Sequence, residues 1–211
     1  MRPDRLASML TTLLARVQAL RAARTGRLLV GITGAPGAGK STLAQLLAQH
    51  LGRATVVPMD GFHLANAELA RLGRTDRKGA PDTFDAAGYA ALLRRLRDTV
   101  DETVWAPTFD HVLNEPVAGA VPVPPEIEIV ITEGNYLLLD VPPWDRVRDL
   151  LDLAVYLTAD DAERVDGLLS RQRAKGLDEA AARDWVFRSD EANARLVAAT
   201  APRADLRLHR A

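Results

Sequence analysis

The chain has 211 residues, 47% of them apolar, a formal net charge of −1 and no cysteine. This length and apolar content are typical of one folded domain and exclude a disordered chain, and the missing cysteine excludes disulfides and thiolate metal sites. The near-neutral charge, the absence of an apolar run of about 18 residues and the lack of a signal-peptide pattern predict a cytoplasmic protein with neither a nucleic-acid nor a membrane partner.

The spacing of apolar residues predicts helices that alternate with strands. In chain order we expect a helix within 1–25, a strand at 28–33, a helix to about 51, a strand at 55–60, a short helix near 64–72 and a helix at 85–99. Next come a strand at 104–106, an extended stretch at 115–125, strands at 127–133 and 151–157, helices at 161–174 and 179–198, and an edge strand at 204–208.

This alternation predicts an α/β fold of three layers, in which helices cover both faces of a mostly parallel five-stranded sheet. Because proline cannot donate to a ladder, Pro58 must lie at a sheet edge or at the end of its strand. We expect a single domain over 1–211, with the helices at about 160–198 forming a lid.

A phosphate-binding pattern, G-x-x-x-x-G-K-[ST], separates the first strand from the following helix. Its residues are Gly34, Ala35, Pro36, Gly37, Ala38, Gly39, Lys40, Ser41 and Thr42. Glycines let consecutive N–H groups turn toward one anion, and the helix N-terminus adds unpaired donors. The pattern therefore predicts that all nine residues bind the phosphates of a nucleotide, with Lys40 near the outer phosphates and Ser41 at a Mg²⁺ ion.

Two acids follow strands that should end at the same edge of the sheet as this loop. Asp60 ends the second strand, where Gly61 allows a sharp exit, and it is the candidate base for an attacking hydroxyl. Glu133 ends the isoleucine-rich strand and is the candidate magnesium acid, because a buried carboxylate needs a cationic partner.

Several phosphate-loop chemistries are disfavoured by motifs that the chain lacks. Lysine occurs only at 40, 78 and 175, so the guanine-specifying Asn-Lys-x-Asp of GTPases is missing, and no LSGGQ-like signature of transporter ATPases occurs. A small-metabolite kinase also needs mobile cations over the transferred group. Arg171 and Arg173, on the first lid helix, are the candidates, with Lys175 beside them.

The chain resembles the P-loop kinase group that contains uridine kinase, phosphoribulokinase and type I pantothenate kinase. It resembles still more closely the short bacterial proteins described as nucleoside/nucleotide kinases or as candidate fructose transport system kinases. The resemblance lies in residues 34–42, 59–63, 77–85, 109–111, 133–138 and 171–176, with Asn193 beyond them.

This resemblance implies an ATP- and Mg²⁺-dependent kinase that phosphorylates a hydroxyl of a nucleoside, a sugar or a pantothenate-like metabolite. It implies Asp60 as the base, Arg171 and Arg173 as lid arginines, and Asn193 in ATP binding. The implied acceptor-binding residues are His63, Arg77, Lys78, Phe84, Asp110, His111 and Tyr136.

One departure concerns the acceptor pocket, because Phe109 stands where uridine kinases carry tyrosine, and a hydroxyl is lost. The alternative function is a nucleotide-binding regulator or accessory ATPase without a small-molecule acceptor. Related kinases also suggest a homodimer.

Overall fold

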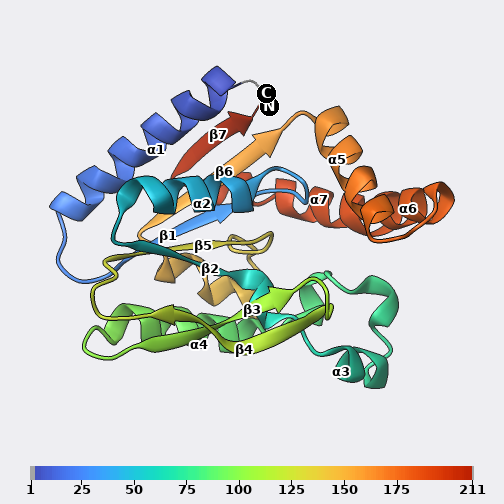
Figure 1. Ribbon diagram of the computed structural model, residues 1–211, viewed down its shortest axis with the longest axis horizontal. Helices are drawn as coiled ribbons and strands as arrows, with labels where there is room; N and C mark the ends of the chain where they lie inside the picture. The colour runs from blue at the N-terminus through green and yellow to red at the C-terminus, as the bar shows by residue number, and fades with distance from the viewer. Residues whose placement is uncertain (1–2, 211) are drawn as a thin grey trace.

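Five parallel strands form the central sheet of the computed structural model, which describes residues 3–210 (Figure 1). The strand order is β2-β5-β1-β6-β7. The strands are β1 (Leu28–Thr33), β2 (Ala54–Pro58), β5 (Ile129–Glu133), β6 (Leu153–Ala159) and β7 (Leu206–Arg210). The predicted α/β sheet is confirmed, and Pro58 ends an edge strand as expected. The expected domain, 1–211, includes residues 1, 2 and 211, which lie outside the described part.

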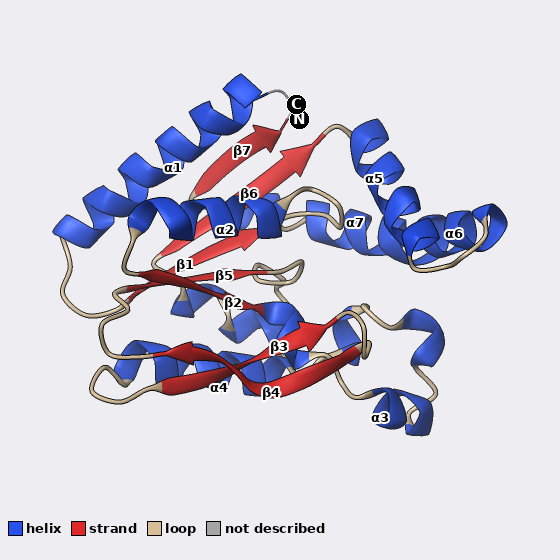
Figure 2. Cartoon of the chain, viewed as in Figure 1, coloured by secondary structure: helices blue, strands red, loops and turns tan. Residues whose placement is uncertain are grey.

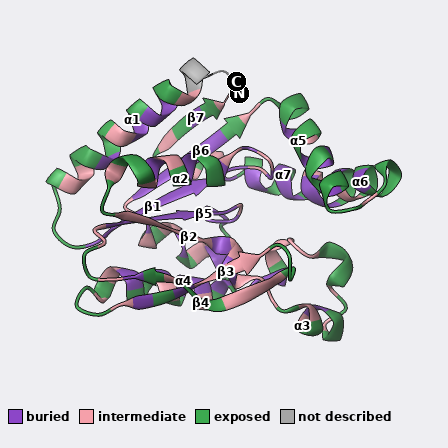
Figure 3. Ribbon diagram, in the orientation of Figure 1, coloured by how far each residue is buried: buried purple, intermediate pink, exposed green. Residues whose placement is uncertain are grey.

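Helices cover both faces of the sheet (Figure 2). One face packs against α1 (Pro3–Ala22) and α2 (Lys40–Leu51), and the other packs against α4 (Ala86–Asp98). Neighbouring residues of β1 point to opposite faces of the sheet. Val30 packs in the core that contains residues of α1 and α2, whereas Leu29 packs in the core that contains residues of α4. Both central strands β1 and β5 are buried throughout, which is typical of a parallel sheet covered on both sides (Figure 3).

An antiparallel hairpin lies apart from the main sheet. It pairs β3 (Val104–Asp110) with β4 (Glu115–Val123), so the expected strand at 104–106 is longer and its partner is the extended stretch. Gly61 touches this hairpin, because a Cβ there would lie 2.5 Å from the Pro107 carbonyl oxygen. The close approach, rather than a left-handed backbone, explains this glycine.

The helices beyond β6 extend past the carboxyl edge of the sheet (Figure 1). They are α5 (Asp161–Ala174), α6 (Glu179–Trp185) and α7 (Glu191–Ala198). The prediction of one helix over 179–198 is wrong in one respect, because a π-turn at Val186–Asp190 separates α6 from α7. Leu168, Leu169, Ala182 and Val186 form a small core of their own between α5 and α6.

Residues 59–84 connect β2 to α4 through three 3₁₀ turns and a short helix, α3 (Asn66–Arg71). The first turn, Met59–Phe62, begins directly after β2 and carries Asp60 to the edge of the sheet. None of the helices within 3–210 combines the length and the apolar character needed to cross a membrane.

Candidate active site

The phosphate-binding loop lies between β1 and α2, as the sequence predicted. Gly34 has φ 153°, and a Cβ at this position would overlap the carbonyl oxygen of Leu157 on β6. Gly39 has φ 93° and precedes the first residue of α2, Lys40. These two positions require glycine, because a side chain would clash in the first case and strain the backbone in the second.

The ammonium group of Lys40 is held inside the loop. Its side chain is 8% exposed, and Nζ donates hydrogen bonds to the Ala35 carbonyl oxygen at 3.1 Å and to Asn135 Oδ1 at 2.7 Å. Burial lowers the pKa of Lys40, while the charges of Glu133 and Asp60 act in the opposite direction. Lys40 is therefore a positioned cation at the place where the motif puts the outer phosphates.

Ser41 and Glu133 meet at the start of α2. Ser41 Oγ donates a hydrogen bond to Glu133 Oε1 at 3.0 Å, and Glu133 is 8% exposed at the end of β5. Burial raises the pKa of Glu133, and the Lys40 charge opposes this shift. A hydroxyl beside a buried carboxylate supplies the hard oxygen donors that Mg²⁺ prefers, so these residues fit such an ion. Residues 3–210 contain no cluster of three or more His, Asp or Glu side chains that could hold a metal alone.

Asp60 lies close enough to these groups for its charge to act on them. It is half-buried, and its charge influences the pKa of both Lys40 and Glu133. The two strands that precede these acids are neighbours, since Pro58 pairs with Glu133. The sheet therefore brings Lys40, Glu133 and Asp60 together at one edge.

An aromatic cluster follows Asp60. The ring of His63 packs between Phe84, at 4.0 Å between centroids, and Phe109, at 4.7 Å. His63 Nδ1 lies 2.9 Å from the Asp60 carbonyl oxygen, and burial lowers the pKa of the imidazole. Lys78 Nζ lies 5.0 Å from the Phe109 centroid, so this cation closes the cluster on one side.

The loop that carries Lys78 is fastened at several points. Lys78 Nζ donates to Asn66 Oδ1 and to the Asn114 carbonyl oxygen, each at 2.6 Å. Arg77 pairs with Asp82 at 2.7 Å on the exposed side of the loop. Tyr136 is buried, and its hydroxyl donates to the Gly79 carbonyl oxygen at 2.5 Å.

Asp110 and His111 lie at the turn of the hairpin. The Asp110 carboxylate accepts hydrogen bonds from the amides of Val112 at 2.8 Å and Leu113 at 2.9 Å. These bonds lower its pKa. His111 is exposed and packs edge-on against Phe109, with 5.3 Å between the ring centroids. In this conformation Asp110 stabilises the turn, and its expected contact with the acceptor stays a prediction.

The two lid arginines differ in their surroundings. Arg173 pairs with Glu179 at 3.0 Å within the lid. Arg171 instead lies close enough to the phosphate loop for its charge to lower the pKa of Lys40. The charge of Lys175 reaches the same region, because Asp60 influences its pKa. The charges of Arg171 and Lys175 therefore act on the site, whereas Arg173 is paired with Glu179 within the lid.

Asn193, on α7, contacts the loop that carries Lys78. Its Nδ2 donates to the Gly79 carbonyl oxygen at 3.3 Å, and this is the oxygen that the Tyr136 hydroxyl also contacts. The expected contact of Asn193 with ATP stays a prediction, and in this structure Asn193 is held by the Gly79 carbonyl oxygen instead.

Sequence reasoning missed three residues at this site. Asn135 holds Lys40, although it directly follows the predicted acid and could have been suspected on that ground. Arg164, 3% exposed, joins α5 to the loop through the Pro36 carbonyl oxygen at 3.3 Å and pairs with Glu191 at 2.6 Å. In the sequence, nothing distinguishes Arg164 from the solvent-exposed charged residues of the same helix.

Asp190, the third missed residue, ends the π-turn. It is 8% exposed, and its Oδ2 has no hydrogen-bond partner among the described residues. Burial raises its pKa, while the charges of Arg171 and Lys175 act against this shift. π-turns of this kind occur often at functional sites.

Comparison with known proteins agrees with this geometry. The family model described as "Phosphoribulokinase / Uridine kinase family" matches residues 29–211. A candidate uridine kinase of Schizosaccharomyces pombe is 37% identical over 161 residues, which cover 72% of this chain and 68% of that protein. A pantothenate kinase of Mycolicibacterium vanbaalenii is 33% identical over 137 residues, which cover 62% of this chain and only 43% of that protein.

The crystal structure of a candidate fructose transport system kinase from Silicibacter sp. TM1040 superposes with a TM-score of 0.87. The two sequences are 41% identical, and the match covers 94% of this chain and 98% of the other. The chain therefore belongs to the phosphoribulokinase/uridine kinase family and is a phosphotransferase that acts on an alcohol group.

Proposed function

We propose that this protein transfers the γ-phosphoryl group of ATP, with Mg²⁺, to a hydroxyl of a small polar metabolite. The observation that carries this proposal is the convergence of the Lys40 ammonium, the Ser41–Glu133 pair and Asp60 at the carboxyl ends of β1, β5 and β2. A phosphate cradle, a metal site and a base are the parts that phosphoryl transfer needs.

The loop and Lys40 bind the β- and γ-phosphates, and Asn135 keeps the ammonium aimed along the loop. Ser41 and Glu133 hold Mg²⁺, which neutralises charge on the transferring oxygens when it is bound. Arg171, near the end of α5, and Lys175, directly after this helix, add positive charge that stabilises the transferred group.

Asp60 acts on the acceptor. The acceptor oxygen forms a bond to the γ-phosphorus, and the bond from this phosphorus to the bridging oxygen of ADP breaks. The hydroxyl proton passes to the Asp60 carboxylate, which lies at the edge of the sheet beside the aromatic cluster. Most of the catalysis comes from positioning and electrostatic stabilisation.

The acceptor class is a nucleoside, a sugar or a pantothenate-like molecule, because relatives of this chain are named for each of these. The cluster of His63, Phe84 and Phe109 offers flat rings, and Lys78 adds a positive charge. A cytoplasmic location and self-association into a homodimer stay predictions.

The test is ADP release measured across a panel of nucleosides, sugars and pantothenate, with mass spectrometry of the products. We expect one class of acceptor to stimulate ADP release and to gain one phosphomonoester. ATP hydrolysis that no acceptor stimulates would instead favour a nucleotide-binding regulator and contradict the proposal.

A further inference from the structure

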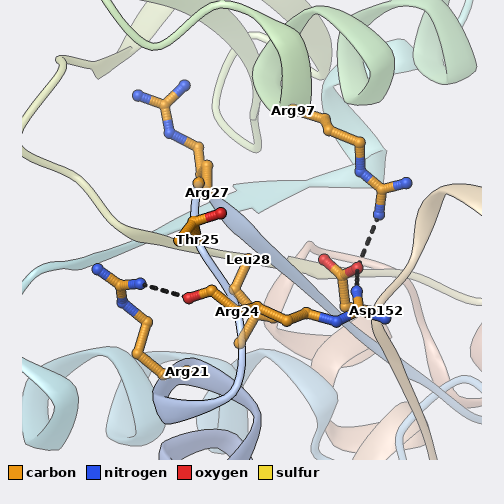
Figure 4. A pocket seen from close by; sticks show the side chains of 8 residues that line it. Arg21, Arg24, Thr25, Arg27, Leu28, Arg97 and Asp152 are labelled. Atoms are coloured by element: carbon orange, nitrogen blue, oxygen red, sulfur yellow. Dashed lines mark hydrogen bonds and ion pairs between the residues drawn. The ribbon is translucent and has the colours of Figure 1, made fainter.

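A second site candidate lies at the opposite edge of the sheet from the phosphate loop. A cavity of about 270 Å³ opens where the segment after α1 enters β1, and residues from α4 and from the start of β6 complete its wall (Figure 4). The lining residues are Arg21, Arg24, Thr25, Gly26, Arg27, Leu28, Arg97 and Asp152. Four of these eight residues are arginines, and none belongs to the kinase site described above.

The charge of the wall is unbalanced. Asp152 is the single acid of the lining, against four guanidinium groups. Arg21 pairs with a neighbouring acid, Glu128, at 2.8 Å, but Glu128 also pairs with Arg53 at 2.5 Å. Positive charge therefore exceeds negative charge around a partly enclosed space, where like charges repel more strongly than they do in bulk water.

Two of the arginines retain free donors. Arg24 uses Nη1 on Asp152, and Arg97 uses Nη2 on Asp152 at 3.0 Å and on the Leu150 carbonyl oxygen at 2.8 Å. Within residues 3–210 no partner is found for Nε and Nη2 of Arg24 or for Nε and Nη1 of Arg97. Arg24 thus keeps one complete edge, Nε with Nη2, and such an edge matches two oxygens of a phosphate. Arg97 keeps Nε and Nη1, which point to different sides of its guanidinium, so each of these can donate one separate hydrogen bond.

Arg27 has a different role. It is 5% exposed and donates to the backbone carbonyl oxygens of Leu96 and Thr99, each at 2.8 Å. In Figure 4 its guanidinium points away from Asp152, whereas Arg24 and Arg97 both reach toward that carboxylate. Arg27 therefore holds the backbone of the cavity wall in place, whereas Arg24 and Arg97 provide hydrogen-bond donors for an anion.

We propose that this cavity binds a small anion of the phosphate class, a phosphate ester or inorganic phosphate, at a site separate from the nucleotide site. The volume lies just below the range of roughly 300–1,000 Å³ that drug-sized ligands occupy, which suits a small metabolite rather than a nucleotide or a peptide. The amides of Thr25 and Gly26, which have no backbone acceptor in the described chain, lie on the same wall and can add donors.

The location connects this site to the kinase machinery. β1 begins at the cavity with Leu28 and ends at the phosphate loop, and β6 begins beside Asp152 and ends at the lid helix α5. Asp152 fastens the two strands, because its Oδ2 accepts from the Leu29 amide at 2.8 Å. An anion that breaks the ion pairs of Arg24 and Arg97 with Asp152 therefore acts where β1 and β6 begin.

The test is an NMR titration of ¹⁵N-labelled protein with inorganic phosphate. A saturating, non-hydrolysable ATP analogue with Mg²⁺ keeps the phosphate loop filled. We expect saturable shifts of the Thr25 and Gly26 amides and of the Arg24 and Arg97 Nε–H signals. Shifts that sodium chloride at equal ionic strength reproduces, or no shifts up to tens of millimolar phosphate, would overturn the proposal.

Variants separate binding from folding. The double variant Arg24→Gln/Arg97→Gln should weaken phosphate binding by about tenfold or more, whereas Arg16→Gln, an exposed arginine on α1, should leave it unchanged. Asp152→Asn should tighten phosphate binding, because it releases both guanidinium groups while its amide oxygen can still accept from Leu29. A purely structural clamp predicts lower thermal stability for Asp152→Asn without any gain in phosphate affinity, and that result would also overturn the proposal.

Discussion

Ser41 Oγ donates a hydrogen bond to Glu133 Oε1 across 3.0 Å, and this bond joins the first turn of α2 to the end of β5. The two residues are separated by 92 positions in the chain. Their side chains therefore meet only because β1 and β5 are hydrogen-bonded neighbours, with Ile32 paired to Glu133.

Glu133→Gln tests the metal site. Glutamine can keep the contact with Ser41, but it lacks the negative charge that a divalent cation requires. We expect the apparent Mg²⁺ affinity to fall by about 10- to 100-fold, measured as the Mg²⁺ dependence of ADP release. Glu126→Gln, an exposed neighbour before the same strand, is the control. An unchanged Mg²⁺ requirement in Glu133→Gln would remove Glu133 from the metal site.

Asp60→Asn tests the base. The amide keeps the size of the side chain and loses the ability to take the proton, so kcat should fall by about 10²–10⁴ with little change in ATP affinity. Steady-state kinetics with the best acceptor and nucleotide titration measure the two quantities. The exposed Asp98→Asn on α4 should behave as the unaltered protein. Turnover at the unaltered rate in Asp60→Asn would contradict the assignment.

Substitutions of the two lid arginines, Arg171 and Arg173, should differ in their effect on kcat. Arg171→Gln is expected to lower kcat at least about tenfold, because arginines that stabilise the transferring phosphoryl group can contribute about 10³–10⁵. Arg173→Gln removes an exposed pair with Glu179, which contributes about 0–1 kcal/mol to stability, and should leave kcat within about twofold. Equal losses in both variants would show that Arg173 leaves Glu179 during the reaction.

Asp190→Asn tests the buried, unpartnered acid. Burial raises the native pKa of Asp190 above its ordinary value, so the free energy of unfolding falls as the pH rises from that value through the native pKa. Asparagine removes this penalty and should stabilise the protein by about 1–3 kcal/mol near neutral pH. The gain should shrink below the ordinary carboxyl pKa.

Thermal unfolding across pH, with the exposed Asp184→Asn as control, measures this effect. A loss of stability in Asp190→Asn at neutral pH would mean that the carboxylate has an ionic partner in solution. Lower activity together with higher stability would identify Asp190 as a functional group kept at a cost in stability.

The sequence predicted the parts of the site that depend on neighbouring residues. The phosphate loop was found because its glycines, lysine and serine lie within nine positions, and Asp60 and Glu133 because each ends an apolar run. Parallel strands then bring such ends to one edge, as the fold confirms.

What could not be predicted depends on contacts between distant segments. Asn135 reaches Lys40 across 95 positions, and Arg164 reaches the Pro36 carbonyl oxygen across 128. The π-turn at 186–190 has no propensity signal that distinguishes it from the α-helical turns on either side. The stretch at 115–125 was expected to be extended, but its antiparallel pairing with β3 was missed, because its prolines and glycine break the alternation that is typical of a strand.

The carbonyl oxygen of Gly79 accepts from both the Tyr136 hydroxyl and Asn193 Nδ2. A carbonyl oxygen has two lone pairs, so these bonds use its full accepting capacity. Because both bonds share this one oxygen, the position of Gly79 fixes its loop at once against Tyr136, which follows β5, and against Asn193 on α7, so a substitution that moves Gly79 disturbs both contacts together.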